Sequence, residues 1–144
     1  MAKNMFKKYT ESKTREWEVP EGTVSGDLVV HDVSGQIGVA LTDRGDAVRP
    51  VGIPGVTGGT VPSGGVGNKP TAATVAVDGS WLFTITGAAD GETVAGTGTA
   101  AGTEVFQDEN DAQTVALTGT VSVGVIDDGR IIDGVGPILI GAVL

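Results

Sequence analysis

The sequence predicts an all-β fold, a compact β-barrel or β-sandwich, and three observations support this. Glycine supplies 24 of the 144 residues, more than double its usual share of ~7%. The glycines separate short runs of Val, Ile and Thr, which favour strands joined by tight turns. No stretch has the apolar period of an amphipathic helix. With 40% apolar and 19% charged residues, the chain is also too apolar to stay disordered.

The chain divides into an extended N-terminal arm, residues 1–16, and a single β-domain, residues 17–144. The arm is rich in lysine and lacks the alternation of a strand, and short polar termini are usually mobile unless they are tied down. After the arm, Trp17 and Val19 alternate with Glu16 and Glu18. This pattern predicts a first strand with one wet face.

Residues 24–43 contain the pair of strands around which the rest of the domain is organised. The β-branched runs 28–30 and 37–41 are separated by Val33-Ser34-Gly35, which indicates a tight antiparallel pair. In the next segment, 47–54, two prolines favour an edge strand. Residues 55–70, rich in Gly and Pro, are expected to form a flexible loop.

Residues 73–86 have the pattern of a β-hairpin. A one-residue change of register would move the apolar side chains of one strand to the other face of the hairpin. We therefore expect the register that keeps them on one face, which needs a three-residue loop at 78–80. This loop aligns Ala73, Val75 and Val77 with Trp81, Phe83 and Ile85 on one face. The hairpin belongs to 71–101, a segment interpreted as an insertion, of which 87–101 is a loop or weak strand.

The C-terminal third predicts further strands at 102–106, 114–118 and 121–126. Asp128-Gly129 suits a two-residue hairpin turn that would pair Ile126 with Ile131 and Val125 with Ile132. The run 138–144 is apolar, and leaving it in water would cost roughly 1.5–3 kcal/mol per large side chain. We therefore expect this run to close the barrel or to line a trimer interface. Its candidate residues are Ile138, Ile140, Val143 and Leu144.

Charge and composition exclude several kinds of partner. The chain has no cysteine, which excludes disulfides and thiolate metal sites. Residues 1–15 carry a net charge of +4 and residues 16–144 a net charge of −13, so the body would repel nucleic acid. The arm could bind phosphate or an acidic protein surface, or it could be a solvated tail. No signal peptide and no transmembrane segment is expected.

The polar residues that could suggest catalysis are better explained as parts of strands and turns. His31 lies near Asp27, Asp32 and Ser25, but Ser25 and His31 would be about 20 Å apart on a strand. Residues 64–71 have a faint resemblance to a phosphate-binding loop, but Asn68 breaks the required spacing.

The remaining candidates are also explained without a ligand. The acidic turn 108–111 lacks the Gly and distal Glu of a calcium loop, and acidic turns such as 108–111 and 127–128 are mostly solvated. Arg44-Gly45-Asp46 is expected to be a turn. The hydrophobic core should take most of the aromatic rings. We therefore predict no catalytic residue, no metal, no cofactor and no small-molecule substrate.

Several short motifs, in order, resemble the capsid decoration (cement) proteins of tailed bacteriophages. The chain opens with Met-Ala-Lys-Asn, and Pro20 is followed by Gly-Thr-Val. The segment Ser-Gly-Asp-Leu-Val begins at Ser25 and Gly-Val-Ala-Leu-Thr-Asp at Gly38. Gly-Thr-Glu-Val-Phe begins at Gly102, and Val-Gly-Val at Val123. The region 53–101 matches poorly.

This resemblance implies a β-tulip-like fold and a homotrimer bound to the major capsid protein. The trimer would sit at three-fold and quasi-three-fold positions on the outer surface of the virion, after assembly in the host cytoplasm. The arm is the expected capsid contact. Its candidate residues are Lys3, Phe6, Lys7, Lys8, Tyr9, Lys13, Arg15 and Trp17. The alternative is a carbohydrate- or receptor-binding β-module on the virion, which would need exposed coplanar aromatic rings.

Overall fold

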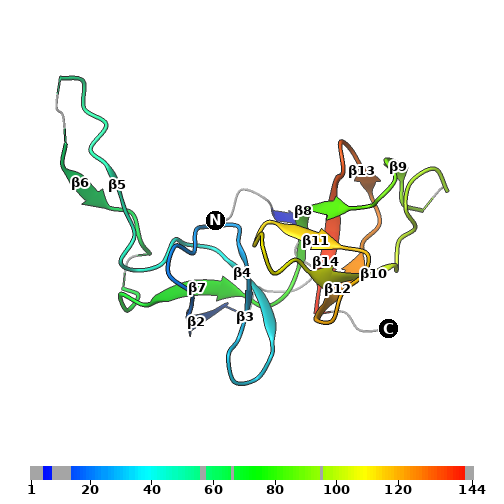
Figure 1. Cartoon of the computed structure of the whole chain (residues 1–144), viewed down its shortest axis with the longest axis horizontal. Helices are drawn as coiled ribbons and strands as arrows, with labels where there is room; N and C mark the ends of the chain where they lie inside the picture. Colours follow the sequence, from blue (N-terminus) through cyan, green and yellow to red (C-terminus); the bar gives the residue numbers. More distant parts are fainter. Residues whose placement is uncertain (1–4, 8–13, 56–57, 66, 95, 142–144) are drawn as a thin grey trace.

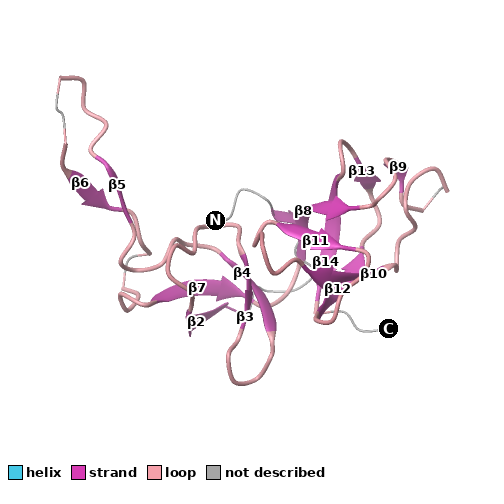
Figure 2. Ribbon diagram, viewed as in Figure 1, coloured by secondary structure: helices cyan, strands magenta, loops and turns pink. Residues whose placement is uncertain are grey.

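Fourteen strands and no helix make up the secondary structure of the described residues in a computed structural model (Figures 1 and 2). The structure describes residues 5–7, 14–55, 58–65, 67–94 and 96–141. The predicted all-β fold is confirmed. The strands are β1 Met5–Lys7, β2 Thr14–Glu18, β3 Leu28–Val30, β4 Ile37–Ala40, β5 Val48–Pro50, β6 Thr60–Pro62, β7 Ala72–Ala76, β8 Ser80–Thr86, β9 Gly91–Glu92, β10 Glu104–Gln107, β11 Thr114–Ala116, β12 Ser122–Ile126, β13 Arg130–Ile131 and β14 Val135–Ile140.

Five of these strands, β8, β11, β10, β12 and β14, close into a barrel. The pairing of β14 with β8, from Val135 opposite Thr84 to Leu139 opposite Ser80, completes the ring. All pairs in the ring are antiparallel except β8 with β11. The barrel interior is filled by large apolar side chains that alternate along the strands, as its closure requires. They include Trp81, Phe83, Val105, Val115, Val123 and Ile138, each no more than 1% exposed.

A second, four-stranded sheet in the order β2-β7-β4-β3 packs beside the barrel. Leu28, Ile37, Val39 and Ala76 of this sheet share one hydrophobic cluster with the barrel core. The opposite face holds a separate cluster of Trp17, Val19, Val29, Ala73 and Val75. Because both faces are covered, the sheet contributes to two cores at once.

The expected antiparallel pair in residues 24–43 is confirmed as β3 and β4. Leu28 lies opposite Val39, and Val30 opposite Ile37. The pair is anchored to the barrel side of the molecule because the Leu28 amide donates to the carbonyl of Ala112 at 2.7 Å.

The predicted hairpin at 73–86 is wrong. Its first strand, β7, pairs with β2 and β4, whereas its second strand, β8, belongs to the barrel. The chain crosses between the sheets at residues 77–79, where the Trp81 indole donates to the Asp78 carbonyl at 2.9 Å. Alternation of apolar residues shows which face of a strand is buried, but it does not show which strand lies beside it. Both strands bury the expected face, although each pairs with a different strand from the one expected. Both are interior strands of their sheets, a placement unlike that of a peripheral insertion.

The hairpin predicted at Asp128-Gly129 is also wrong. Ile126 pairs with Ile138 and Val125 with Leu139, while Ile131 pairs with Gly91 of β9. The next Asp-Gly dipeptide in the sequence, Asp133-Gly134, does form a two-residue hairpin turn. It lies between Ile132 and Val135, which form an antiparallel β-bridge.

Strands β5 and β6 form a ribbon, which we define as Val48–Pro62, that projects from the rest of the molecule (Figure 1). β5 pairs only with β6, which agrees with the edge strand expected in 47–54. The loop expected at 55–70 therefore contains a strand, Thr60–Pro62. The base of the ribbon is fixed to the second sheet, because Gly45 donates to Ala72 and Asp46 to Pro70, both at 2.8 Å.

The predicted arm boundary at residue 16 is also corrected. Residues 14–16 belong to β2, which pairs with β7 along its whole length from Thr14 opposite Ala76 to Glu18 opposite Ala72. The short strand β1 pairs with β8 at Trp81 and Ser80. The N-terminal segment is thus joined to both sheets instead of extending freely from one.

Candidate interaction surface

The predicted capsid-contact residues fall into three groups. Lys3, Lys8, Tyr9 and Lys13 lie outside the described residues. Phe6 and Lys7 belong to β1, of which the structure gives the strand pairing. Arg15 is exposed on β2, and Trp17 is buried.

The expected capsid contact at Trp17 is wrong, because this residue belongs to the core and is only 7% exposed. It packs in the outer cluster of the second sheet with Val29, Ala73 and Val75. Such a burial position makes Trp17 an anchor of β2 and not a surface contact. The sequence signal that could have shown this was already present, since Trp17 is the apolar member of an alternating Glu-Trp-Glu strand.

The residues around His31 take part in separate local contacts. The His31 Nδ1 lies 3.1 Å from the Ser34 amide and 3.0 Å from the Ser34 hydroxyl. Ser25 donates its hydroxyl to the Leu41 carbonyl. Asp27 accepts from the Val24 amide at 3.0 Å. The contacts of His31 with Ser34 and of Asp27 with Val24 hold turns, whereas Ser25 links two segments that are distant in the sequence. These side chains form no relay of nucleophile, base and carboxylate.

The two remaining sequence candidates are also parts of turns. Arg44 and Asp46 form an ion pair with each other at 2.7 Å. Gly45 lies against backbone so closely that a Cβ there would be 2.1 Å from the Lys69 carbonyl oxygen. In residues 64–71, the Asn68 amide group lies within 3.2 Å of the hydroxyls of Thr42 and Thr74. Both segments are fixed to the second sheet by these contacts.

The acidic turn at 108–111 caps its own backbone. Asp108 accepts from the Asn110 amide, and Asp111 accepts from the Gln113 amide, each at 2.9 Å. The Thr114 hydroxyl also donates to Asp111. Hydrogen bonds from Gln113 and Thr114 stabilise the ionised carboxylate and lower the pKa of Asp111. Across the described ranges, no group of three His, Asp or Glu side chains is placed to hold a metal ion.

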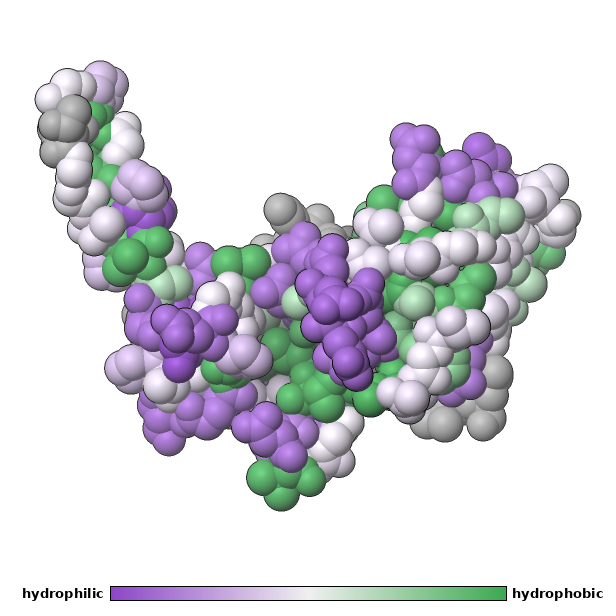
Figure 3. All heavy atoms as spheres, in the orientation of Figure 1, coloured by the Kyte–Doolittle hydropathy of each residue, from purple (hydrophilic) through white to green (hydrophobic). Residues whose placement is uncertain are grey.

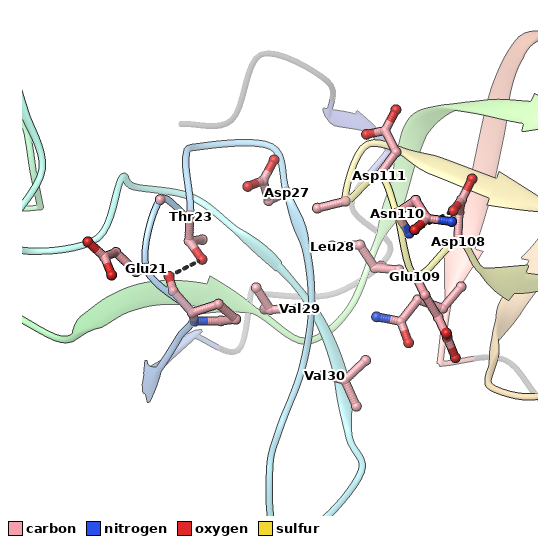
Figure 4. A pocket seen from close by; sticks show the side chains of 14 residues that line it. Glu21, Thr23, Asp27, Leu28, Val29, Val30, Asp108, Glu109, Asn110 and Asp111 are labelled. Atoms are coloured by element: carbon pink, nitrogen blue, oxygen red, sulfur yellow. Dashed lines mark hydrogen bonds between the residues drawn. The ribbon is translucent and has the colours of Figure 1, made fainter.

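An open cleft of about 360 Å³ separates β3 from the turn at 108–111 (Figure 4). We call it the acidic cleft, because Figure 4 shows carboxylates on both of its sides and the apolar strand β3 between them. Its floor includes the buried Leu28 and Val29 and the half-buried Val30. Among the residues that the structure describes, no lysine or arginine lines the cleft. Its five acidic residues are Glu21, Asp27, Asp108, Glu109 and Asp111. Sequence reasoning missed this cleft, because the two acidic segments are about eighty residues apart and only the fold brings them together.

The aromatic side chains offer no platform for a sugar within the described part of the chain. Trp17, Trp81 and Phe83 are buried, as the sequence predicted for most rings, and Phe106 is half-buried. The exposed large apolar residues are aliphatic instead. In the residues that can be placed, we find no helical segment with the length and apolar character needed to traverse a bilayer.

Comparisons with models of protein families, with curated proteins and with solved structures found no match to this chain. Its own sequence and structure therefore carry the functional argument.

Proposed function

We propose that the protein is a decoration protein of a tailed bacteriophage, which binds the outer surface of the mature icosahedral shell and stabilises it without catalysing a reaction. In this proposal the protein is a homotrimer at three-fold and quasi-three-fold positions, and its partner is the major capsid protein.

The observation that carries the proposal is the placement of the motifs that resemble this class. The two motifs of residues 25–43 supply β3 and β4, which pair with each other. The motifs at 102–106 and 123–125 supply β10 and β12, which also pair, with Val105 opposite Gly124. Segments that are short and unspecific when taken singly thus form adjoining parts of two sheets. This arrangement supports the view that they belong to one kind of scaffold.

The physical character of the surface supports adhesion over chemistry. The acidic cleft is open to solvent and the ribbon projects from the body (Figure 3). The polar side chains singled out from the sequence are used in local structural contacts. A trimer can touch several shell subunits at once, so weak contacts add up to firm attachment through effective concentration. A protein that binds only the mature shell stabilises that state by mass action.

The basic residues of the N-terminal segment are proposed to contact acidic groups of the shell. Because β1 and β2 both pair with the body, deleting residues 2–16 would remove strands as well as charge. The sharper variant changes Lys3, Lys7, Lys8 and Lys13 to Gln, which keeps the chain length.

The test measures the number of copies bound per purified shell, by co-sedimentation and by cryo-electron microscopy. Wild-type protein should saturate mature shells, and the four-Gln variant should bind more weakly and with less dependence on salt. A variant with Glu104 and Asp128 changed to Gln is the control for altered charge outside the segment. Absence of wild-type protein from the shell would overturn the proposal, and unchanged binding by the four-Gln variant would remove the basic segment from it.

A further inference from the structure

The ribbon is a feature that the proposed function does not yet use. Its two strands pair only with each other, and it carries exposed apolar side chains, with Val48 59% and Ile53 58% exposed. Arg49 is the single charged residue in the sequence of the ribbon, although the whole chain has a net charge of −9. The ribbon is thus an apolar, weakly cationic extension of a strongly acidic protein.

The ribbon can bind a partner through its faces more easily than through its edges. Val48 lies opposite Pro62, and Pro50 opposite Thr60, so each of its strands carries a proline without an N–H group. Proline on an edge interferes with the addition of another strand. Arg49 and Val61, which also lie opposite each other, share one face of the ribbon, and Val48, Pro50 and Pro62 share the other.

The acidic cleft has the properties that complement this ribbon. Its floor at Leu28, Val29 and Val30 is apolar, and its lining within the described ranges has five carboxylates and no lysine or arginine. Among these, Glu109 is exposed at the rim. The face of the ribbon that carries Arg49 and Val61 places one guanidinium beside an apolar side chain, which matches an apolar floor with an acidic rim. The ribbon of the same molecule is held away from this cleft, because its base is fixed to β7 and to the preceding loop at Ala72 and Pro70.

We propose that the ribbon Val48–Pro62 of one copy docks in the acidic cleft of a second copy, with Arg49 facing the carboxylates of the rim. Each copy then gives a ribbon and receives one, which is a head-to-tail contact. Such a contact generates a ring where the rotation between copies closes and an open filament where it does not. We expect the closed ring, which the measured mass tests. The docking contact between two copies is inferred from the charges and apolar residues of the ribbon and the cleft. Only the expectation that the ring has three members rests on the proposed function.

The test is the mass of the purified full-length protein in solution, measured by light scattering and native mass spectrometry without any shell present. The wild type should be a closed oligomer that loosens as salt rises. Arg49→Glu places a carboxylate against an acidic rim and should shift the protein to monomer. Adding Glu109→Arg in the same chain should restore the oligomer, because the pair of charges is exchanged at every contact.

Matched variants separate this contact from a general effect of charge. Asp32→Arg changes an exposed acid outside the cleft, and it should neither dissociate the wild type nor rescue Arg49→Glu. Replacing residues 51–59 by Asn-Gly shortens the ribbon, and none of the replaced residues that the structure describes belongs to the core. It should give a folded monomer, as shown by an unchanged circular dichroism spectrum.

A wild-type monomer at the highest soluble concentration would overturn the proposal, as would an unchanged oligomer with the shortened ribbon. A shortened variant that stays oligomeric but no longer binds shells would assign the ribbon to the shell instead. Since mass is measured without shells, failure of this contact and failure of shell binding are distinguishable.

Discussion

The indole ring of Trp17 lies 5.0 Å from the imidazole ring of His31, centroid to centroid, at an interplanar angle of 59°. The two residues come from β2 and from the end of β3, which are the outer strands of the four-stranded sheet. The contact is possible because Gly38, on the intervening strand β4, has no side chain. A Cβ at Gly38 would lie 3.1 Å from the indole and 2.3 Å from a methyl group of Val75. The Trp17 ring therefore reaches across the sheet, from β2 at one edge to the residue that follows β3 at the other.

Trp17→Ala should lower the free energy of unfolding by about 3–5 kcal/mol, the range for removing a large buried aromatic ring. Urea denaturation followed by circular dichroism measures this change. Arg15→Ala, an exposed change on the same strand, is the control and should stay within about 0.5 kcal/mol of wild type. Equal effects of the two changes would contradict the anchoring role of Trp17.

Gly38→Ala should destabilise the protein by about 1–3 kcal/mol, because an added methyl group overpacks a filled site. In the double variant with Trp17→Ala, the cost of the Gly38 change should be smaller, since one of the two obstructing side chains has gone. Val75 remains, so the relief should be partial. Strict additivity of the two free-energy changes would show that the ring and Gly38 do not interact.

Gly134→Ala should cost about 1–2 kcal/mol, because this residue has a φ of 75°, where an L-residue is strained. The preceding Asp133 has a φ of 51°, and Asn tolerates that conformation. Asp133→Asn is therefore the control and should leave the melting temperature nearly unchanged. A larger loss for the Asn variant than for the Ala variant would contradict this account of the turn.

Asp111 should make stability depend on acid pH. Its hydrogen bonds hold its pKa in the folded protein below the ordinary value of 3.8. The ionised carboxylate therefore contributes stability above that value, and the contribution is lost as the pH falls through the lower, folded pKa. Asp111→Ala should reduce the melting temperature at pH 7 and have a smaller effect in strong acid. An effect that grows toward acid pH would reverse the assigned sign.

Patterns that depend on neighbouring residues were predictable from the sequence. The β3–β4 pair was predicted because two apolar runs flank a short turn at Val33–Gly35, so that partner and register follow from local spacing. The burial of Trp81, Phe83 and Ile85 was predicted because alternation shows which face of a strand is apolar. The Asp-Gly turn was placed wrongly because the sequence offers several such dipeptides. The pairings of β12 with β14 and of β13 with β9 exclude Asp128-Gly129.

The candidate site was less predictable because its parts are distant in the sequence. The acidic cleft joins Glu21 and Asp27 to residues 108–111, a proximity created when β3 docks on the barrel. Trp17 was included among the expected capsid contacts, although its alternation with Glu16 and Glu18 also predicted a strand. Pairing with β7 decided its position instead, since that strand supplies the apolar surface on which the ring is buried.

The closure of the barrel by β14 has a consequence for biosynthesis. Its partner β8 precedes it by more than fifty residues, and β8 also pairs in parallel with β11. Such non-local pairings form slowly. The ring therefore stays open on the ribosome until residue 140 has emerged, and a nascent chain exposes the edges of β8 and β12 to neighbouring chains. Crowded synthesis would make this interval the most aggregation-prone stage in the life of the molecule.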